Sequence, residues 1–340
     1  MSDATLKRIT LGNLGTAYLQ TGQVPKAIAC YEQALALARE NKDSQGECVV
    51  LNWLGNCYGN LGLIQQAIDY YEQSLSIARE ITSRKDEGHA LGNLGNRYAE
   101  LGQTRRAIEV YEQALAICRE IGDRRGEGAD LSNIAERYGE LGDFQRALEY
   151  YELALANARE IGNRYGEAKR LRGMAEILID QTRYTQALSH LQESVEIGAE
   201  LNSPEVNNEA HYSLALAHLY SGNLPVARAA AQQARQYDYP LENHNVVALL
   251  GVVALRQNDS PAAREAFSAA LAHAEGLLAH TPDYFEALDA KALALTGMGE
   301  IENARAAYQA ARAVNSDPGI VQRATRLLNQ LEGVTKFWEE

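Results

Sequence analysis

The sequence lacks an excess of positive charge, a long apolar segment and an apolar signal core. Its 340 residues carry a formal net charge of −13 and an isoelectric point near 5.1. This balance argues against nucleic acid and anionic membrane surfaces as partners, because binding to phosphates needs a basic face. Residues 1–8 contain no apolar signal core, and the most apolar stretch, residues 246–255, is too short to span a bilayer.

The four cysteines, Cys30, Cys48, Cys57 and Cys118, form no CxxC pair. We expect them to be small buried apolar residues in a reducing compartment, which indicates a cytoplasmic protein.

Motifs for catalysis are also missing. The sequence contains no GxxxxGK[ST] phosphate loop, no HExxH and no GxSxG. His211 and His218 lie seven residues apart on one expected helix, and we interpret them as core or edge residues rather than metal ligands. The sequence therefore predicts a protein without catalytic residues, metal site or cofactor.

A forty-residue pattern fills most of the chain instead. Leu14-Gly15-x-x-Tyr18 returns forty residues later as Leu54-Gly55-x-x-Tyr58, and Ala27-Ile28-x-x-Tyr31 returns as Ala67-Ile68-x-x-Tyr71. A fixed period of this length indicates stacked helical units rather than one globular core.

Each period reads as two antiparallel helices, a first helix A and a second helix B. Apolar residues from Ala27 to Ala38 follow helical spacing, and Gly22 marks a short turn before them. Pro25 lies where a missing N–H costs little, at the start of helix B. Small residues such as Gly15 and Ala27 allow the two backbones to approach closely.

The recurring small residue of helix A divides the chain into about eight units. We expect six regular units over 1–240, two degenerate units over 241–316, a helix over 317–331 that caps the last apolar face, and a tail over 332–340. Phe337 and Trp338 of this tail have the apolar character needed to fold back onto the stack.

This pattern resembles the tetratricopeptide repeat family over nearly the whole chain. The forty-residue unit is longer than the usual ~34 residues, and its joins, such as residues 120–127, are similar to those of the Pins/LGN adaptors, the kinesin light chains and the repeat regions of bacterial signalling ATPases. The resemblance implies an all-α, right-handed superhelical solenoid. It also implies that helix A lines a concave groove for an extended segment of a partner.

Polar residues recur on the expected groove side of the A helices. An asparagine amide both donates and accepts, so a row of amides can pair with the backbone of an extended peptide. Equally, polar residues without a function can persist after duplication of a repeat. The candidate partner-binding residues are Asn13, Asn52, Trp53, Asn56, Asn93, Asn96, Asn133, Glu136, Glu140 and Arg172.

Several members of this row admit two interpretations. Glu140 and its neighbours favour a partner with basic residues, or form a solvated acidic face. Trp53 is either a contact for one ligand side chain or a packing residue between A helices. Arg172 lies in a basic cluster with Lys169 that suits an anion contact or a specificity point. Arg97 and Arg137 are explained by ion pairs within their own helices.

Three functions remain open. The first is a non-catalytic adaptor whose groove binds an extended protein segment. The second is the sensor region of a larger bacterial signalling ATPase, and the third, less favoured because no helical effector bundle precedes the repeats, is a peptide-pheromone receptor. An enzyme fits least well, and the sequence leaves the partner and the oligomeric state open.

Overall fold

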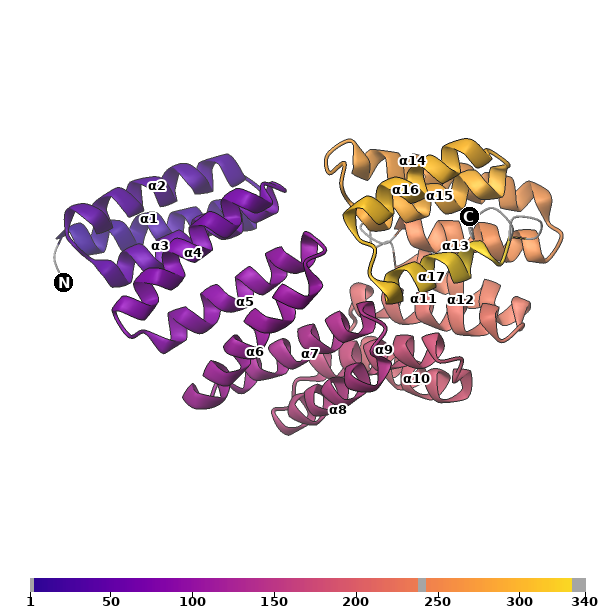
Figure 1. Cartoon of the computed structure of the whole chain (residues 1–340), viewed down its shortest axis with the longest axis horizontal. Coiled ribbons are helices and arrows are strands. Elements are labelled where there is room, and N and C mark those ends of the chain that lie inside the picture. Colours follow the sequence, from indigo (N-terminus) through magenta and orange to yellow (C-terminus); the bar gives the residue numbers. More distant parts are fainter. Residues whose placement is uncertain (1–2, 238–242, 332–340) are drawn as a thin grey trace. The chain divides into compact units, whose positions relative to one another are not determined.

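The computed structural model describes residues 3–237 and 243–331, and every regular element in these ranges is a helix (Figure 1). The expected tail over 332–340, with Phe337 and Trp338, lies outside the described residues. The helices of the described ranges are α1 (Asp3–Gln20), α2 (Val24–Glu40), α3 (Ser44–Asn60), α4 (Ile64–Glu80), α5 (Arg84–Glu100), α6 (Thr104–Ile121), α7 (Arg124–Glu140), α8 (Phe144–Glu160), α9 (Arg164–Asp180), α10 (Tyr184–Glu200), α11 (Pro204–Tyr220), α12 (Leu224–Gln236), α13 (Asn243–Arg256), α14 (Ser260–Leu278), α15 (Phe285–Met298), α16 (Ile301–Val314) and α17 (Pro318–Leu328).

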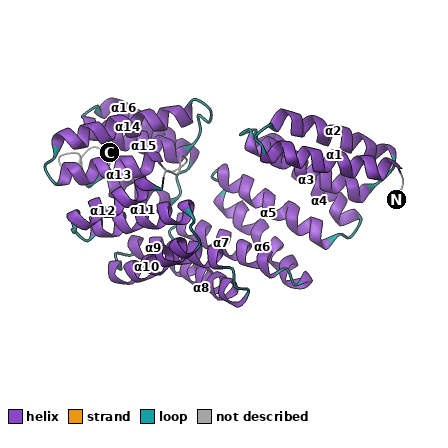
Figure 2. Ribbon diagram, turned by 180° about the vertical axis from the view of Figure 1, so that it is seen from behind, coloured by secondary structure: helices purple, strands orange, loops and turns teal. Residues whose placement is uncertain are grey.

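The helices form eight A/B pairs followed by α17, which confirms the expected all-α repeat architecture (Figure 2). Odd-numbered helices up to α15 are A helices and even-numbered helices are B helices. The predicted turn glycines close the A helices: Gly22 and Gly62 both have a φ of 72°, a left-handed conformation that costs a glycine little.

The chain divides into two compact units, residues 1–134 and 135–340, and the boundary falls within α7. We call them unit 1 and unit 2 and describe each by itself. In both units A helices contact their own B helix, the B helix before them and the next A helix, as α3 does with α4, α2 and α5, and α9 with α10, α8 and α11. The surface formed by the A helices is called the A face below.

The small residue of helix A is required by the tyrosine of helix B. A Cβ atom added to Gly15 would lie 2.5 Å from Cε1 of Tyr31. A Cβ atom added to Gly55 would lie at the same distance from Cε1 of Tyr71. Well-packed interiors have no room for such an atom. The repeating glycine therefore sets how closely the two helices of one unit approach.

Successive units are joined by a buried carboxylate and by apolar packing. Leu54 of α3 lies in one cluster with Tyr31 and Leu35 of α2. An arginine near the end of each early B helix contacts a glutamate in the first turn of the next A helix, as in Arg79–Glu87 at 2.9 Å. The same pair recurs as Arg39–Glu47 at 2.7 Å, Arg119–Glu127 at 2.9 Å and Arg159–Glu167 at 2.6 Å.

All four cysteines are buried and unpaired, as expected. Burial raises the pKa of Cys57 to about 11, so this thiol stays protonated at neutral pH. Cys118 of α6 contacts Asp130 of α7, with 3.5 Å between Sγ and Oδ2.

Asp130 is 6% exposed, and burial raises its pKa from 3.8 to about 7. A carboxyl with a raised folded pKa contributes stability that is complete below its unfolded pKa and is lost as the pH rises toward 7. We therefore expect Asp130→Asn to be more stable than the wild type by ~1–4 kcal/mol at about pH 8, with a smaller difference at about pH 5. Urea denaturation at both pH values measures this.

Gln113→Ala on the exposed face of α6 is the control, and its effect should not change between the two pH values because glutamine carries no ionisable group. A stability difference for Asp130→Asn that stays constant with pH would contradict the prediction.

The final helix does more than the expected capping. Leu328 and Leu331 join the apolar cluster of α11–α15 and so cover it, as predicted. However, Gly319 lies directly against the backbone carbonyls of Gly139 and Glu140 at the end of α7. The start of α17 therefore packs against the end of α7, and α17 lies on the A face of unit 2.

Candidate functional site

Asn13, Asn93 and Asn133 hold the same position of the repeat on three A helices of unit 1. Asn13 on α1 is exposed, and Asn93 on α5 and Asn133 on α7 are half-buried. The Nδ2 of Asn93 donates to Oδ1 of Asn52 over 3.5 Å, which is a long hydrogen bond. The amides are therefore partly accessible and partly engaged with the adjacent helix.

Asn52 corrects the sequence analysis. It is only 8% exposed, and its Nδ2 donates to Oγ of Ser74 on α4 over 2.6 Å. Ser74 in turn donates to the carbonyl of Cys48. Because a buried amide needs such partners, Asn52 belongs to the core rather than to an accessible surface.

Of the two interpretations of Trp53, the structure supports packing between A helices. Its ring lies 5.3 Å from that of Tyr31, measured between centroids, and a Cβ atom on Gly12 would lie 2.5 Å from Cζ3 of Trp53. The indole thus fills the space between α1 and α3. The residue remains partly accessible.

Asn56 and Asn96 are held in place by tyrosines of their own units. Oδ1 of Asn56 accepts a hydrogen bond from the hydroxyl of Tyr71, and Oδ1 of Asn96 accepts one from Tyr111, both over 2.6 Å. This orients each half-buried amide and directs the Nδ2 donor away from helix B. Such an oriented donor suits a backbone carbonyl of a bound segment.

The acidic members of the predicted row lie in unit 2. Glu136 is exposed, and Arg137 lies 3.0 Å from it and 3.1 Å from Glu140. The expected ion pairs within helices are confirmed here and at Arg97–Glu100, 2.8 Å apart. Burial raises the pKa of Glu140 to about 7, against the attraction of Arg137.

Arg172 on α9 is engaged by the protein's own carboxylates. Its Nη1 lies 2.5 Å from Glu176, and its Nε lies 3.1 Å from Glu209 on α11. Lys169 pairs with Glu205 in the same way, at 3.1 Å. The basic cluster of this repeat thus links α9 to α11, which corrects the expectation that Arg172 stands ready for an external anion.

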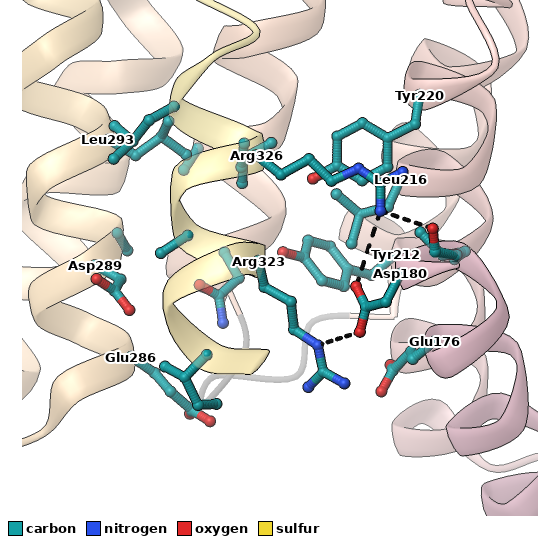
Figure 3. A pocket seen from close by; sticks show the side chains of 18 of the residues that line it. Glu176, Asp180, Tyr212, Leu216, Tyr220, Glu286, Asp289, Leu293, Arg323 and Arg326 are labelled. Atoms are coloured by element: carbon teal, nitrogen blue, oxygen red, sulfur yellow. Dashed lines mark hydrogen bonds and ion pairs between the residues drawn. The ribbon is translucent and has the colours of Figure 1, made fainter. Parts of the chain in front are cut away.

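A cavity of about 250 Å³ lies on the A face of unit 2, between α9, α11, α13, α15 and α17 (Figure 3). Glu176 and Asp180 hold the repeat positions of Glu136 and Glu140 in the next A helix. They lie on one side of the cavity, and Asp289 lies on the other. Leu216 and Leu293 contribute apolar wall. Burial raises the pKa of Asp289 to about 6, opposed by Arg312.

Two arginines of α17 complete this site, and sequence reasoning missed both. Nε of Arg323 lies 2.6 Å from Oδ2 of Asp180, which is 7% exposed. Arg326 donates to the carbonyl of Ile179 over 2.7 Å and to the hydroxyl of Tyr184 over 2.6 Å. The spacing of the two arginines, one turn apart on an unpaired helix, was the available signal, but only the folded chain brings them to α9.

No helix among the described residues is both long and apolar enough to cross a membrane. No group of three or more His, Cys, Asp or Glu side chains within the described ranges is arranged to bind a metal ion.

Comparison with protein families agrees with this architecture. Three tetratricopeptide repeat models match the chain, the first over residues 46–120 and 87–160, the second over 9–41, and the third over 172–240, 212–276 and 249–318. Together they span most of the sequence, so the chain belongs to the tetratricopeptide repeat family. Members of this family are generally non-catalytic protein-interaction scaffolds. No curated protein matches the chain with significant similarity.

Solved structures give further likenesses. A signal transduction ATPase with numerous domains and a tetratricopeptide repeat sensor, from Pyrococcus horikoshii, is 20% identical; the match covers 83% of this chain and 43% of that one, with a TM-score of 0.64. A Rap protein complexed with competence and sporulation factor is 14% identical over 97% of this chain and 78% of its own, with a TM-score of 0.59. Kinesin light chain repeats from Podospora anserina are 21% identical over 60% of this chain and 100% of theirs, with a TM-score of 0.51. At such identities the likeness concerns the fold alone.

Proposed function

We propose that the protein is a non-catalytic interaction module that binds an extended segment of a partner protein along the A face of unit 1. The observation that carries this proposal is the row of accessible amides on the A helices of unit 1: Asn13, Asn93 and Asn133 at one position of the repeat, and Asn56 and Asn96, which tyrosine hydroxyls orient, at the next. Pre-oriented donors lose less entropy when a ligand binds. We place the module in the cytoplasm, in line with its unpaired cysteines.

The chemistry of the site limits what the partner segment needs. Amides along α1, α3, α5 and α7 pair with a peptide backbone irrespective of its side chains. Each hydrogen bond contributes only about 1 kcal/mol, so the binding affinity depends on contacts with several helical repeats. The proposed ligand is therefore an extended protein segment long enough to contact at least three helical repeats.

A binding experiment with a peptide display library tests this proposal. Peptides selected on the full wild-type chain are measured against a variant that carries Asn13→Ala, Asn93→Ala and Asn133→Ala. We expect about 100-fold weaker binding, because three lost contacts of about 1 kcal/mol each sum to about 3 kcal/mol. Circular dichroism checks that the variant is folded.

The matched control replaces exposed glutamines at one register of the B helices, namely Gln33, Gln73 and Gln113, by alanine. These substitutions remove the same kind of side chain from the opposite layer and should leave binding unchanged. Equal affinity of the wild type and the asparagine variant for the selected peptides would refute the proposed site.

A second candidate function is the sensor region of a larger signalling ATPase. It is favoured by the likeness to the repeat sensor of the Pyrococcus horikoshii protein, of which this chain matches 43%. A nucleotide-binding module encoded next to these residues in the intact gene would support it. A peptide-pheromone receptor is the third candidate, supported by the likeness to the Rap protein complexed with competence and sporulation factor.

A further inference from the structure

α17 lies on the A face of unit 2 like a bound helix. Besides the Arg323–Asp180 contact, the guanidinium of Arg326 lies 4.3 Å from the ring centroid of Tyr220 on α11. The hydroxyl of Tyr308 shares a hydrogen bond with Thr325 over 3.1 Å. One side of α17 thus contacts elements that lie more than 140 residues earlier in the chain.

The contacts in the middle of α17 are electrostatic. Arg323 lies in a field of carboxylates from two A helices, namely Glu136 and Glu140 of α7 and Glu176 and Asp180 of α9. Arginine forms planar, charge-assisted contacts with such groups. The A face of unit 2 is therefore complementary to a helix that carries arginines three residues apart.

The fit of α17 to this surface is incomplete. Ala324 follows Arg323 and lines the cavity of about 250 Å³, together with Ile320 and Leu327. The cavity is partly open to solvent, so the packing of α17 leaves room at this surface. Ala324 has the smallest side chain that α17 contributes to this lining, so a larger apolar side chain at its position would reduce the cavity. Figure 3 shows Leu216 and Leu293 on its two sides.

We propose that the A face of unit 2 is a docking site for an amphipathic helix of a partner protein, and that α17 is its internal competitor. The partner helix carries the pattern Arg-Φ-x-Arg, where Φ is a large apolar residue that takes the place of Ala324 in the lining of the cavity. This inference deepens the proposed interaction function, but it uses residues of unit 2 instead of the amides of unit 1.

The attachment of α17 is suited to exchange. It is an 11-residue helix without a B helix of its own, shorter than the length at which isolated helices become stable. Its side chains from Val321 to Leu327 remain partly exposed. Its first turn depends on Gly319, whose lack of a side chain permits the contact with the carbonyls of Gly139 and Glu140.

The test uses labelled peptides that correspond to residues 315–331, one with the native sequence and one with Ala324→Leu. Fluorescence anisotropy measures their binding to the full chain as wild type, as Gly319→Leu and as the double variant Arg323→Ala with Arg326→Ala. Both variants remove anchors of α17 without altering the A helices. We expect both peptides to bind the two variants at least tenfold more tightly than the wild type.

The cavity gives a second, independent expectation. The Ala324→Leu peptide should bind the opened variants at least tenfold more tightly than the native peptide. Adding Asp180→Asn to the Gly319→Leu chain should weaken binding at least tenfold. Equal affinity of the two peptides, or equal affinity for wild type and opened variants, would overturn the proposal.

A measurement on the intact fold covers the case in which an opened variant is unfolded. Ala324→Leu in the full chain should slow hydrogen exchange of the α17 amides severalfold, because the new side chain fills the cavity. Faster exchange in α17 would mean that the cavity rejects a larger residue, and the inference would be wrong.

The two proposed sites can be separated with the same reagents. The three asparagine substitutions in unit 1 should leave the affinity for the helical peptides unchanged, whether they are placed in the wild type or in an opened variant. Gly319→Leu should leave binding of the display-selected extended peptides unchanged. Failure of one pair of results therefore leaves the other proposal standing.

Discussion

Replacing Phe267 by alanine is expected to lower the free energy of unfolding of unit 2 by ~3–5 kcal/mol. Phe267 is fully buried, and its ring fills the space that Gly251 of α13 and Gly297 of α15 leave open. Because neither glycine has a side chain that can move into the void, the cavity cannot easily collapse. The loss should therefore lie near the upper end for a substitution of this kind.

Urea denaturation with circular dichroism measures the overall loss, and hydrogen exchange assigns it to helices. Each repeat of a solenoid is stabilised mainly by the repeats next to it, so the faster hydrogen exchange should centre on α13–α16. The control is Glu265→Ala, an exposed position on the same helix, which should change stability by no more than ~0.5 kcal/mol. Similar effects of the two substitutions would contradict the assignment of Phe267 as the central core residue.

Replacing Leu54 by alanine is expected to cost ~2–5 kcal/mol, and the same change at Leu14 less than ~1 kcal/mol. The two residues hold one position of the repeat. Leu54 is fully buried and packs with Tyr31 and Leu35 of the preceding unit. Leu14 is 43% exposed, because no unit precedes α1 among the described residues.

Thermal and urea unfolding of the two variants give the comparison directly. The pair isolates packing between units from the intrinsic properties of leucine in this motif, since sequence and secondary structure are alike at both sites. A cost at Leu14 equal to that at Leu54 would mean that the motif leucine acts within its own helical pair.

Together, the two candidate surfaces describe one protein with two kinds of recognition. Unit 1 offers oriented amides, which suit an extended backbone. Unit 2 offers carboxylates and a cavity, which suit a basic helix and are covered by α17. The acidic drift that the sequence revealed around Glu140 thus has a basic counterpart within the chain itself.

Prediction from the sequence succeeded where the repeat reports on local packing. The pattern at Gly15 and Tyr31 predicted the helical pair, and Gly22 predicted its turn, because each depends on residues close in the chain. It succeeded less well for the candidate site. Asn52 shares the face expected for partner contacts, yet Ser74 of the adjacent helix draws it into the core.

The sequence by itself determined the helical pairs, their number and the family, because a period of forty residues repeats the same short-range contacts. Only the tertiary structure decided which polar residues stay accessible, since the burial of Asn52 depends on Ser74 of the paired B helix and the pairing of Arg172 depends on Glu209 of the next A helix. It alone also placed α17. The contact between Arg323 and Asp180 joins residues 143 positions apart, and no periodic pattern carries information about a single contact of that range.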